Sequence, residues 1–179
     1  MGFDIYALIE VTWLLIPALA ANGLAPLARG RRPVDGGRLW GGKPILGKGK
    51  TWEGTVLGVV AASLVGGFMA FMRPGVPFEA SAVALTIVPM GFGLGALLGL
   101  GAMAGDIVES LFKRRAGIAR GEPLLVLDQA DFVLGALLFA ALAVAIRLEW
   151  VVWALLWIPV LHYGANGISF AIGMKSRPW

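Results

Sequence analysis

The sequence predicts an all-α integral membrane protein, a bundle of about five transmembrane helices that form a single domain over residues 1–179. Of the 179 residues, 58% are hydrophobic and only 15% are charged, whereas soluble domains carry about 25% charged residues. A chain this short has too little interior to bury so much apolar surface, so lipid must cover part of it. The apolar residues also gather into stretches near the roughly 20 residues that a membrane-spanning helix needs.

Five apolar stretches are expected to cross the membrane, and the fourth is short for a span. They cover residues 5–28, 54–72, 80–104, 132–146 and 150–172. Within them glycines recur every four residues, at Gly91, Gly95 and Gly99 and again at Gly54 and Gly58. Small residues at this spacing let helices approach closely in lipid. We expect these glycines to pack helices within the chain, with a homodimer seam or a substrate groove as the alternatives.

The basic residues lie almost entirely on one side of the predicted bundle. Thirteen of the fifteen Lys and Arg residues fall in residues 29–50, 113–120 and 175–177, and only Arg73 and Arg147 fall elsewhere. Because cytoplasmic loops carry the excess of Lys and Arg, two large polar loops and the C-terminus are predicted to be cytoplasmic and the N-terminus outside. This multi-pass topology in the cell membrane, among membrane lipids, explains the net charge of +4 without a nucleic-acid partner.

The inventory of metal-binding side chains is narrow. The chain has no cysteine, which excludes thiolate metal sites and a cysteine nucleophile, and its one histidine excludes clusters of histidine ligands. Any metal ion must therefore be held mainly by oxygen atoms. Oxygen ligands suit a hard ion, and the sequence points to Mg²⁺.

A polar stripe leaves the membrane at the end of the third predicted span. If the helix continues past residue 104, four polar residues fall at positions i, i+4, i+7 and i+8 and share one face. These residues are Asp106, Ser110, Lys113 and Arg114. Glu109 lies slightly off this stripe and is interpreted as a local counter-ion. Carboxylates at the edge of a span are costly and usually functional, and a solvated helix end with a salt bridge is the alternative.

Two more aspartates begin the fourth predicted span. Asp128 and Asp131 are one helical turn apart and lie at the same membrane edge as Asp106. Three carboxylates at one depth repel one another and require cations. Mg²⁺ that carries a substrate phosphate would be such a partner. Helix capping by Asp128, with Asp131 favoured by the helix dipole, is the alternative. We favour Asp106 and Asp131 as direct metal ligands, with Asp128 ligating or orienting a ligand.

The first polar loop combines glycines with lysines. Its Gly-Lys-Thr sequence at 49–51 resembles the end of a P-loop, but Pro44 stands where that motif requires its first glycine. Glycines still allow backbone amides to approach phosphates, and lysines neutralise them. Lys43, Lys48, Lys50 and Thr51 are therefore candidates for nucleotide binding. A basic loop that meets anionic lipid head groups is the alternative.

Four residues with a carboxylate, amide or imidazole side chain lie inside the predicted spans. They are Glu10, Asn22, His162 and Asn166. Each is more often a satisfied interhelical hydrogen-bonding group than a ligand.

Several motifs together resemble the CDP-archaeol synthases, distant relatives of the CDP-diacylglycerol synthases. Gly105-Asp106 is followed by Ser110 and the basic run at 113–115, and then by Asp-Gln-Ala-Asp-Phe at 128–132. The glycine-rich loop at 35–52, Ala-Asn-Gly at 21–23 and the ending Pro-Trp also match. The chain departs from the family pattern at Lys48, where an aspartate is frequent, and at Glu109, where a basic residue is frequent.

The resemblance implies a nucleotidyl transfer. CTP and the phosphate of an unsaturated diether lipid, 2,3-bis-O-geranylgeranylglycerol 1-phosphate, would give CDP-archaeol and pyrophosphate with Mg²⁺ as cofactor. The residues implied in catalysis are Asp106, Asp128, Asp131, Lys113 and Ser110. The residues implied in CTP binding are Asn22, Lys43, Lys48, Lys50, Thr51, Arg114 and Arg115.

The competing reading is a small membrane transporter or channel for a phosphorylated or anionic solute. Transport residues are expected to line a path through the middle of the membrane. Here the charged residues cluster at one predicted face, which favours an enzyme. A purely structural membrane subunit leaves three aspartates at one depth unexplained. Lipid-tail selectivity, the number of metal ions and homo-oligomerisation stay open.

Overall fold

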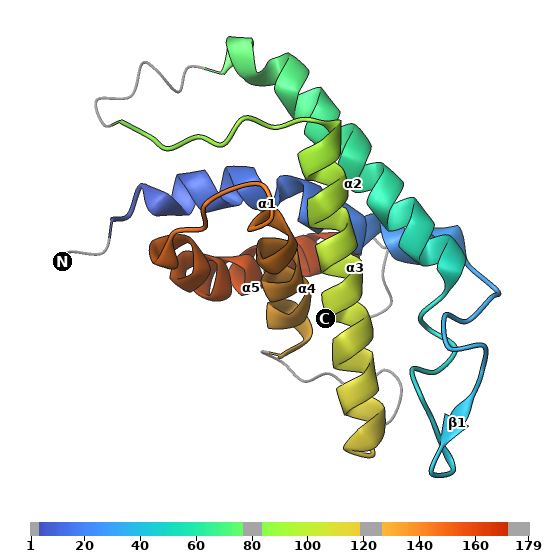
Figure 1. Ribbon diagram of the computed structural model, residues 1–179. Coiled ribbons are helices and arrows are strands. Elements are labelled where there is room, and N and C mark those ends of the chain that lie inside the picture. The colour runs from blue at the N-terminus through green and yellow to red at the C-terminus, as the bar shows by residue number, and fades with distance from the viewer. Residues whose placement is uncertain (1–3, 77–83, 119–126, 172–179) are drawn as a thin grey trace.

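A computed structural model describes residues 4–76, 84–118 and 127–171 of the chain. Figure 1 shows helices that pack against one another, with a small hairpin beside the C-terminal end of one of them. The α-helices are α1 (Ala7–Leu24), α2 (Trp52–Met72), α3 (Phe92–Arg115), α4 (Leu127–Ala140) and α5 (Leu148–Ala171). The short elements in the described residues are η1 (Ala25–Ala28), η2 (Arg73–Gly75), β1 (Leu39–Trp40) and β2 (Lys43–Pro44).

The helices confirm the predicted class of membrane protein. By length and composition, α1, α2 and α3 are able to cross a membrane, whereas α4 and α5 contain the shorter apolar stretches Ala130–Ala140 and Leu148–Leu161. Large apolar side chains such as Phe68, Phe71 and Leu138 lie exposed on the outside of the bundle. Lipid covers such side chains at little cost, while water would not.

The predicted third span begins too early in the sequence. Residues 84–91 are not helical, and α3 begins only at Phe92. Pro89 and Gly91 disfavour a helix here. Tertiary contacts also hold this segment extended, because the Thr86 amide donates to Glu10 over 2.5 Å and the Trp13 indole donates to the Val88 carbonyl over 3.0 Å.

The predicted fourth span ends too late. Helix α4 stops at Ala140, and residues 141–147 form turns and irregular chain, although the prediction continued to residue 146. No local breaker explains this end, because the sequence Ala-Leu-Ala-Val-Ala-Ile favours a helix. The turn instead brings Arg147 back to Glu10 on α1, where the two side chains form an ion pair of 2.6 Å. A tertiary contact has overridden helix propensity.

Glycines set the spacing between the helices. A β-carbon at Gly95 would lie 2.4 Å from the Ala62 carbonyl oxygen of α2, and one at Gly99 would lie 2.7 Å from the Ala62 β-carbon. These two members of the predicted stripe therefore pack within the chain, as expected. Gly91 differs, since nothing lies within 4 Å of its β-carbon position.

The closest approach joins α3 to α4. A β-carbon at Gly101 would lie 2.2 Å from the Gly135 carbonyl oxygen, and one at Gly105 would lie 2.1 Å from the Asp131 carbonyl oxygen. No other residue type fits at such distances without moving a backbone. This seam brings residues 131–136 of α4 against the middle of α3.

The α1–α2 loop, residues 29–51, is closed at its base. The Val34 amide donates to the Lys50 carbonyl over 2.9 Å, and the Trp52 amide donates to the Arg32 carbonyl over 3.0 Å. At its tip, β1 pairs with β2 through Gly41 and Gly42, whose φ angles of 59° and 77° favour glycine. The loop is therefore ordered, and its hairpin tip lies beside α3.

Candidate active site at the seam of α3 and α4

Three carboxylates meet at the α3–α4 seam. Asp106 and Glu109 lie one turn apart on α3, and Asp131 lies about one turn into α4. One oxygen atom from each lies within 4.8 Å of the other two. Because Gly105 has no side chain, α4 approaches closely enough for Asp131 to join the other two. We name these three residues the carboxylate cluster.

The carboxylate cluster shares two residues with the predicted set, which was Asp106, Asp128 and Asp131. The structure brings Asp106 and Asp131 together, as expected for the two direct ligands. Glu109 was interpreted as a local counter-ion, which its ion pair with Lys113 supports, and its carboxylate also lies in the cluster. Its i, i+3 spacing from Asp106 is the signal that reveals this shared face. The side chain of Asp128 lies outside the described residues.

Two lysines partly balance the cluster. The Lys50 ammonium of the α1–α2 loop forms an ion pair with Asp106, and Lys113 pairs with Glu109 over 2.5 Å. Within the described part of the chain, the buried Oδ1 of Asp131 accepts no hydrogen bond. A buried acceptor without a partner costs free energy. A hard cation between the three carboxylates would satisfy this oxygen, so the donor set fits Mg²⁺.

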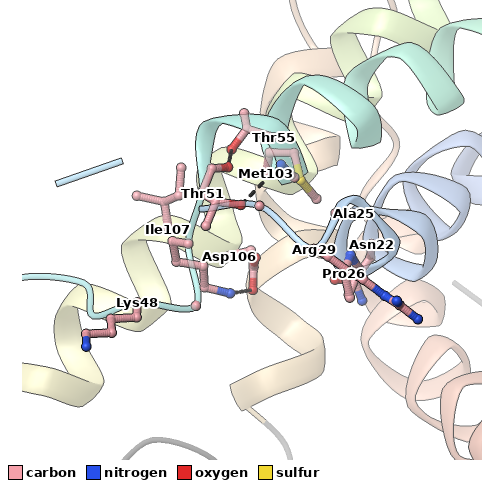
Figure 2. A pocket seen from close by; sticks show the side chains of 14 residues that line it. Asn22, Ala25, Pro26, Arg29, Lys48, Thr51, Thr55, Met103, Asp106 and Ile107 are labelled. Carbon is pink, nitrogen blue, oxygen red and sulfur yellow. Dashed lines mark hydrogen bonds and ion pairs between the residues drawn. The ribbon is translucent and has the colours of Figure 1, made fainter. Parts of the chain in front are cut away.

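A polar cavity of about 290 Å³ lies between the end of α1, the α1–α2 loop and α3. We name it the α1-side cavity. Figure 2 shows Asn22 and Arg29 on one side of this cavity and Asp106 on the other. Thr51 also lines it, but its hydroxyl already caps α2 by accepting the Gly54 amide over 3.2 Å. The cavity thus presents cations, an amide and a helix N-terminus to one space.

A second polar cavity, of about 480 Å³, lies on the other side of residues 48–50. We name it the hairpin-side cavity. Ser110, Lys113 and Arg114, three of the four residues of the predicted polar stripe, line it from α3, whereas Asp106 lines the α1-side cavity. Lys48 and Lys50 line both cavities, so this short segment is the wall between them.

Two of the predicted nucleotide-binding residues line neither polar cavity. The Lys43 ammonium lies 3.5 Å from the position of a Gly117 β-carbon, at the end of α3. Arg115 turns its guanidinium towards the hairpin, where it contacts backbone carbonyls. The sequence places both residues in basic segments, and only the folded loop separates them from the others.

Asp35 lines the hairpin-side cavity and organises the loop around it. It accepts the amides of Gly37 and Leu46 over 2.8 Å and that of Gly47 over 3.2 Å. Partial burial raises the pKa of this carboxyl, but the backbone hydrogen bonds outweigh it, so the pKa lies below its usual value. Asp35 therefore acts as an ionised brace for the loop.

An apolar groove of about 710 Å³ follows the outer side of the α3–α4 seam. Val108, Phe112, Leu134 and Leu138 line it, and all four side chains are exposed on the bundle surface. We name it the α3–α4 groove. At its polar end lie residues of the carboxylate cluster together with Lys113, which also lines the hairpin-side cavity. A charged site and an apolar groove therefore share a border.

Helices able to cross a membrane, a carboxylate cluster with two lysines, and an apolar groove beside that cluster are the features of a membrane-embedded enzyme that handles charged groups. Residues 4–179 match the family profile described as CarS-like, CDP-archaeol synthase, and the chain belongs to this family. The membership confirms the resemblance seen in the sequence. It also confirms the class of enzyme, a CTP-dependent nucleotidyltransferase of lipid biosynthesis.

Curated relatives and a solved structure agree with the family. A CDP-archaeol synthase of Halobacterium salinarum is 41% identical over 179 residues, covering 96% of each chain. The CDP-archaeol synthase of Thermococcus kodakarensis is 40% identical over 168 residues, covering 93% of this chain and 94% of its own. A solved intramembrane enzyme for archaeal membrane lipid biosynthesis is 38% identical, with a TM-score of 0.74 over 89% of this chain and 94% of that one.

Proposed function

We propose that the protein transfers CMP from CTP to the phosphate of an unsaturated diether glycerol phosphate, giving CDP-archaeol and pyrophosphate. The observation that carries this proposal is the carboxylate cluster on the border between two polar cavities and an apolar groove. A water-soluble nucleotide and a membrane lipid must meet at such a border. The names of the relatives support the product.

The reaction requires little acid or base chemistry from the protein. An oxygen of the lipid phosphate attacks the α-phosphorus of CTP, the bond to the β-phosphate oxygen breaks, and pyrophosphate leaves. The attacking phosphate is already ionised near neutral pH, so no strong general base is needed. The protein's contribution is then positioning and neutralisation of charge.

The carboxylate cluster would hold the magnesium ion. Asp106, Glu109 and Asp131 supply the oxygen ligands, and Asp128 in the first turn of α4 stays a candidate ligand or orienting residue. The bound ion would supply positive charge to the phosphate oxygens. Magnesium keeps several positions for water and phosphate, which a site of few carboxylates allows.

The residues around both polar cavities would hold CTP. Lys48, Lys50 and the backbone of Gly49 stand between the cavities, where a triphosphate could reach cations from either side. Asn22 and Thr51 border the α1-side cavity, and the α2 N-terminus adds its amide dipoles. Lys113, Ser110 and Arg114 border the hairpin-side cavity and suit the remaining phosphate charge.

The α3–α4 groove would receive a hydrocarbon chain of the lipid substrate. Its walls are apolar, its outer side opens towards lipid, and its polar end reaches Lys113 and the carboxylate cluster. A lipid phosphate lying along it would place its charge at the cluster and its chain in the membrane. With five spans oriented by the basic loops, this site lies at the cytoplasmic face of the cell membrane.

The direct test uses purified protein in detergent with labelled CTP, Mg²⁺ and a lipid phosphate carrying either diether or diester chains. We expect a CDP-lipid and one pyrophosphate per turnover, with the unsaturated diether preferred. Omitting the lipid should abolish pyrophosphate release. Transfer that proceeds without any divalent cation would contradict the magnesium proposal, and no CDP-lipid with any lipid phosphate would contradict the function itself.

A further inference from the structure

Arg115, the last residue of α3, holds the tip of the β-hairpin. Its guanidinium donates to the Trp40 carbonyl over 2.6 Å, to the Pro44 carbonyl over 2.6 Å and to the Lys43 carbonyl over 3.2 Å. Its central carbon also lies 5.1 Å from the centre of the Trp40 ring. Hydrogen bonds to carbonyls and contact with an aromatic face both use the planar fork of arginine, which lysine lacks.

The hairpin needs such an anchor. Each strand has only two residues, and Leu39 and Trp40 are 65% and 62% exposed. A two-stranded hairpin of this size is marginally stable by itself. Asp35 secures the base of the loop through Leu46 and Gly47, but it does not reach the tip.

The hairpin position in turn shapes the hairpin-side cavity. Leu39 and Pro44 are themselves walls of this cavity, opposite Lys113 and Arg114 of α3. A hairpin that swings away from α3 removes these walls from the cavity that Lys48 and Lys50 also line. The location of Arg115 at the end of α3 therefore connects the loop to the helix that carries two of the three clustered carboxylates.

We propose that Arg115 is a positioning residue that latches the hairpin onto α3 and so completes the nucleotide cavity, without itself contacting a phosphate. This assignment separates Arg115 from its neighbour. Arg114 lines the cavity, and one of its terminal nitrogens donates to the Ile118 carbonyl over 2.6 Å. The proposal rests on the proposed function for its CTP readout, but the latch itself is a structural contact.

The test compares Arg115→Lys with the wild type in two assays. Lysine keeps the positive charge but cannot serve three carbonyls and a ring together, so the hairpin should open more often. We expect the KM for CTP to rise about tenfold while kcat and the KM for lipid change less than about twofold. Trypsin should cleave after Arg38, in the loop just before β1, about tenfold faster.

Two further variants keep the result interpretable. Arg31→Lys makes the same substitution at an exposed position of the same loop and should change neither assay. Trp40→Leu removes only the ring contact, so it should shift both assays in the same direction as Arg115→Lys but less. This second variant also tests the latch if Arg115→Lys does not fold.

The outcomes separate the latch from the function. If Arg115→Lys lowers kcat while cleavage after Arg38 stays unchanged, Arg115 contacts a reacting phosphate and the latch is wrong. Unchanged cleavage with an unchanged KM for CTP also overturns it. If the wild type makes no CDP-lipid, the proposed function fails, and the cleavage rates alone still confirm or overturn the latch.

Discussion

Two groups of membrane-embedded carboxylates in this protein differ in how completely they are satisfied. Glu10, near the start of α1, is 1% exposed and accepts hydrogen bonds from the Thr86 amide at 2.5 Å, from Arg147 at 2.6 Å and from the Trp150 indole at 2.7 Å. The carboxylate cluster instead gathers three acidic groups and leaves Asp131 Oδ1 without a hydrogen bond in the described residues. A buried carboxylate whose oxygens all have partners within the chain is structural. One with an oxygen that can still accept a hydrogen bond or bind a cation is suited to a ligand.

The two groups are also separated in space. Glu10 and Asn22, which borders the α1-side cavity, are twelve residues apart on α1, or roughly 18 Å along the helix axis. The Glu10 network joins α1, the extended segment before α3, and α5. The carboxylate cluster joins α3 and α4. Substitutions in the first group should therefore change stability, and substitutions in the second should change catalysis.

Asp131→Asn should produce the largest loss of activity. The substitution keeps the size of the side chain but removes the charge that the cluster offers to a cation, so we expect kcat to fall at least ~100-fold. Stability should not fall, because an under-satisfied buried charge has been removed. Initial rates at saturating CTP and the Tm in detergent measure the two effects. Near-normal rates at limiting Mg²⁺ would place this carboxylate with Glu10 in the structural group.

Gly105→Ala tests whether helix spacing assembles the cluster. The added methyl group would lie 2.1 Å from the Asp131 carbonyl oxygen, so α4 must shift and carry Asp131 away. A displacement of this kind costs about 100-fold in rate when it misplaces a reacting group. Gly93→Ala is the matched control on the same helix, because nothing lies within 4 Å of its β-carbon position. Equal rates for both variants would show that the seam does not position the site.

Glu10→Gln should reverse the pattern seen for Asp131. The amide cannot accept from three donors at once and leaves Arg147 without its ion pair, so we expect a destabilisation of about 2 kcal/mol. The kcat of the folded enzyme should change less than threefold, since the network lies far from the cavities. Glu149→Gln is the control, because this carboxylate pairs with Arg147 at a partly exposed position and should contribute little. A variant of Glu10 that keeps its Tm but loses turnover would break the comparison.

Sequence patterns predicted the parts of the site that lie on regular helices. The spacing of Asp106, Ser110 and Lys113 placed them on one face of α3, and the location of Asp131 at the start of a span placed it nearby. The same reasoning identified Glu109 as a counter-ion, in agreement with its pair with Lys113, but missed its place beside Asp106 in the cluster. These signals come from residues that are close in the sequence or that recur with the period of a helix.

Contacts between distant segments were not predictable in this way. Pro89 and Gly91 disfavour a helix before Phe92, but no local signal marks the end of α4 at Ala140. Glu10 holds both segments through its bonds to Thr86 and Arg147. Likewise, a basic run does not reveal that Arg115 faces a hairpin while Arg114 faces a cavity. Gly101 and Gly105 were also overlooked as the closest seam, although they too are four residues apart on α3.

Asp35→Asn should have the smallest effect, because it affects the loop rather than the cluster. Like Glu10, Asp35 is a carboxylate with partners within the chain, but it lies outside the spans and braces the loop through Gly37, Leu46 and Gly47. An asparagine can keep the amide contacts of only one oxygen, so we expect the KM for CTP to rise about threefold with little change in kcat. Because the pKa of Asp35 is lowered by folding, its bracing is complete above the usual carboxyl pKa and is lost only as the pH falls through the lower folded value. At neutral pH the wild-type loop has its full brace, and the variant lacks part of it. Trypsin should therefore cleave modestly faster after Arg38 in the variant. If turnover is abolished instead while cleavage is unchanged, Asp35 belongs to the reacting centre, and satisfaction by backbone amides does not distinguish structural from functional carboxylates in this protein.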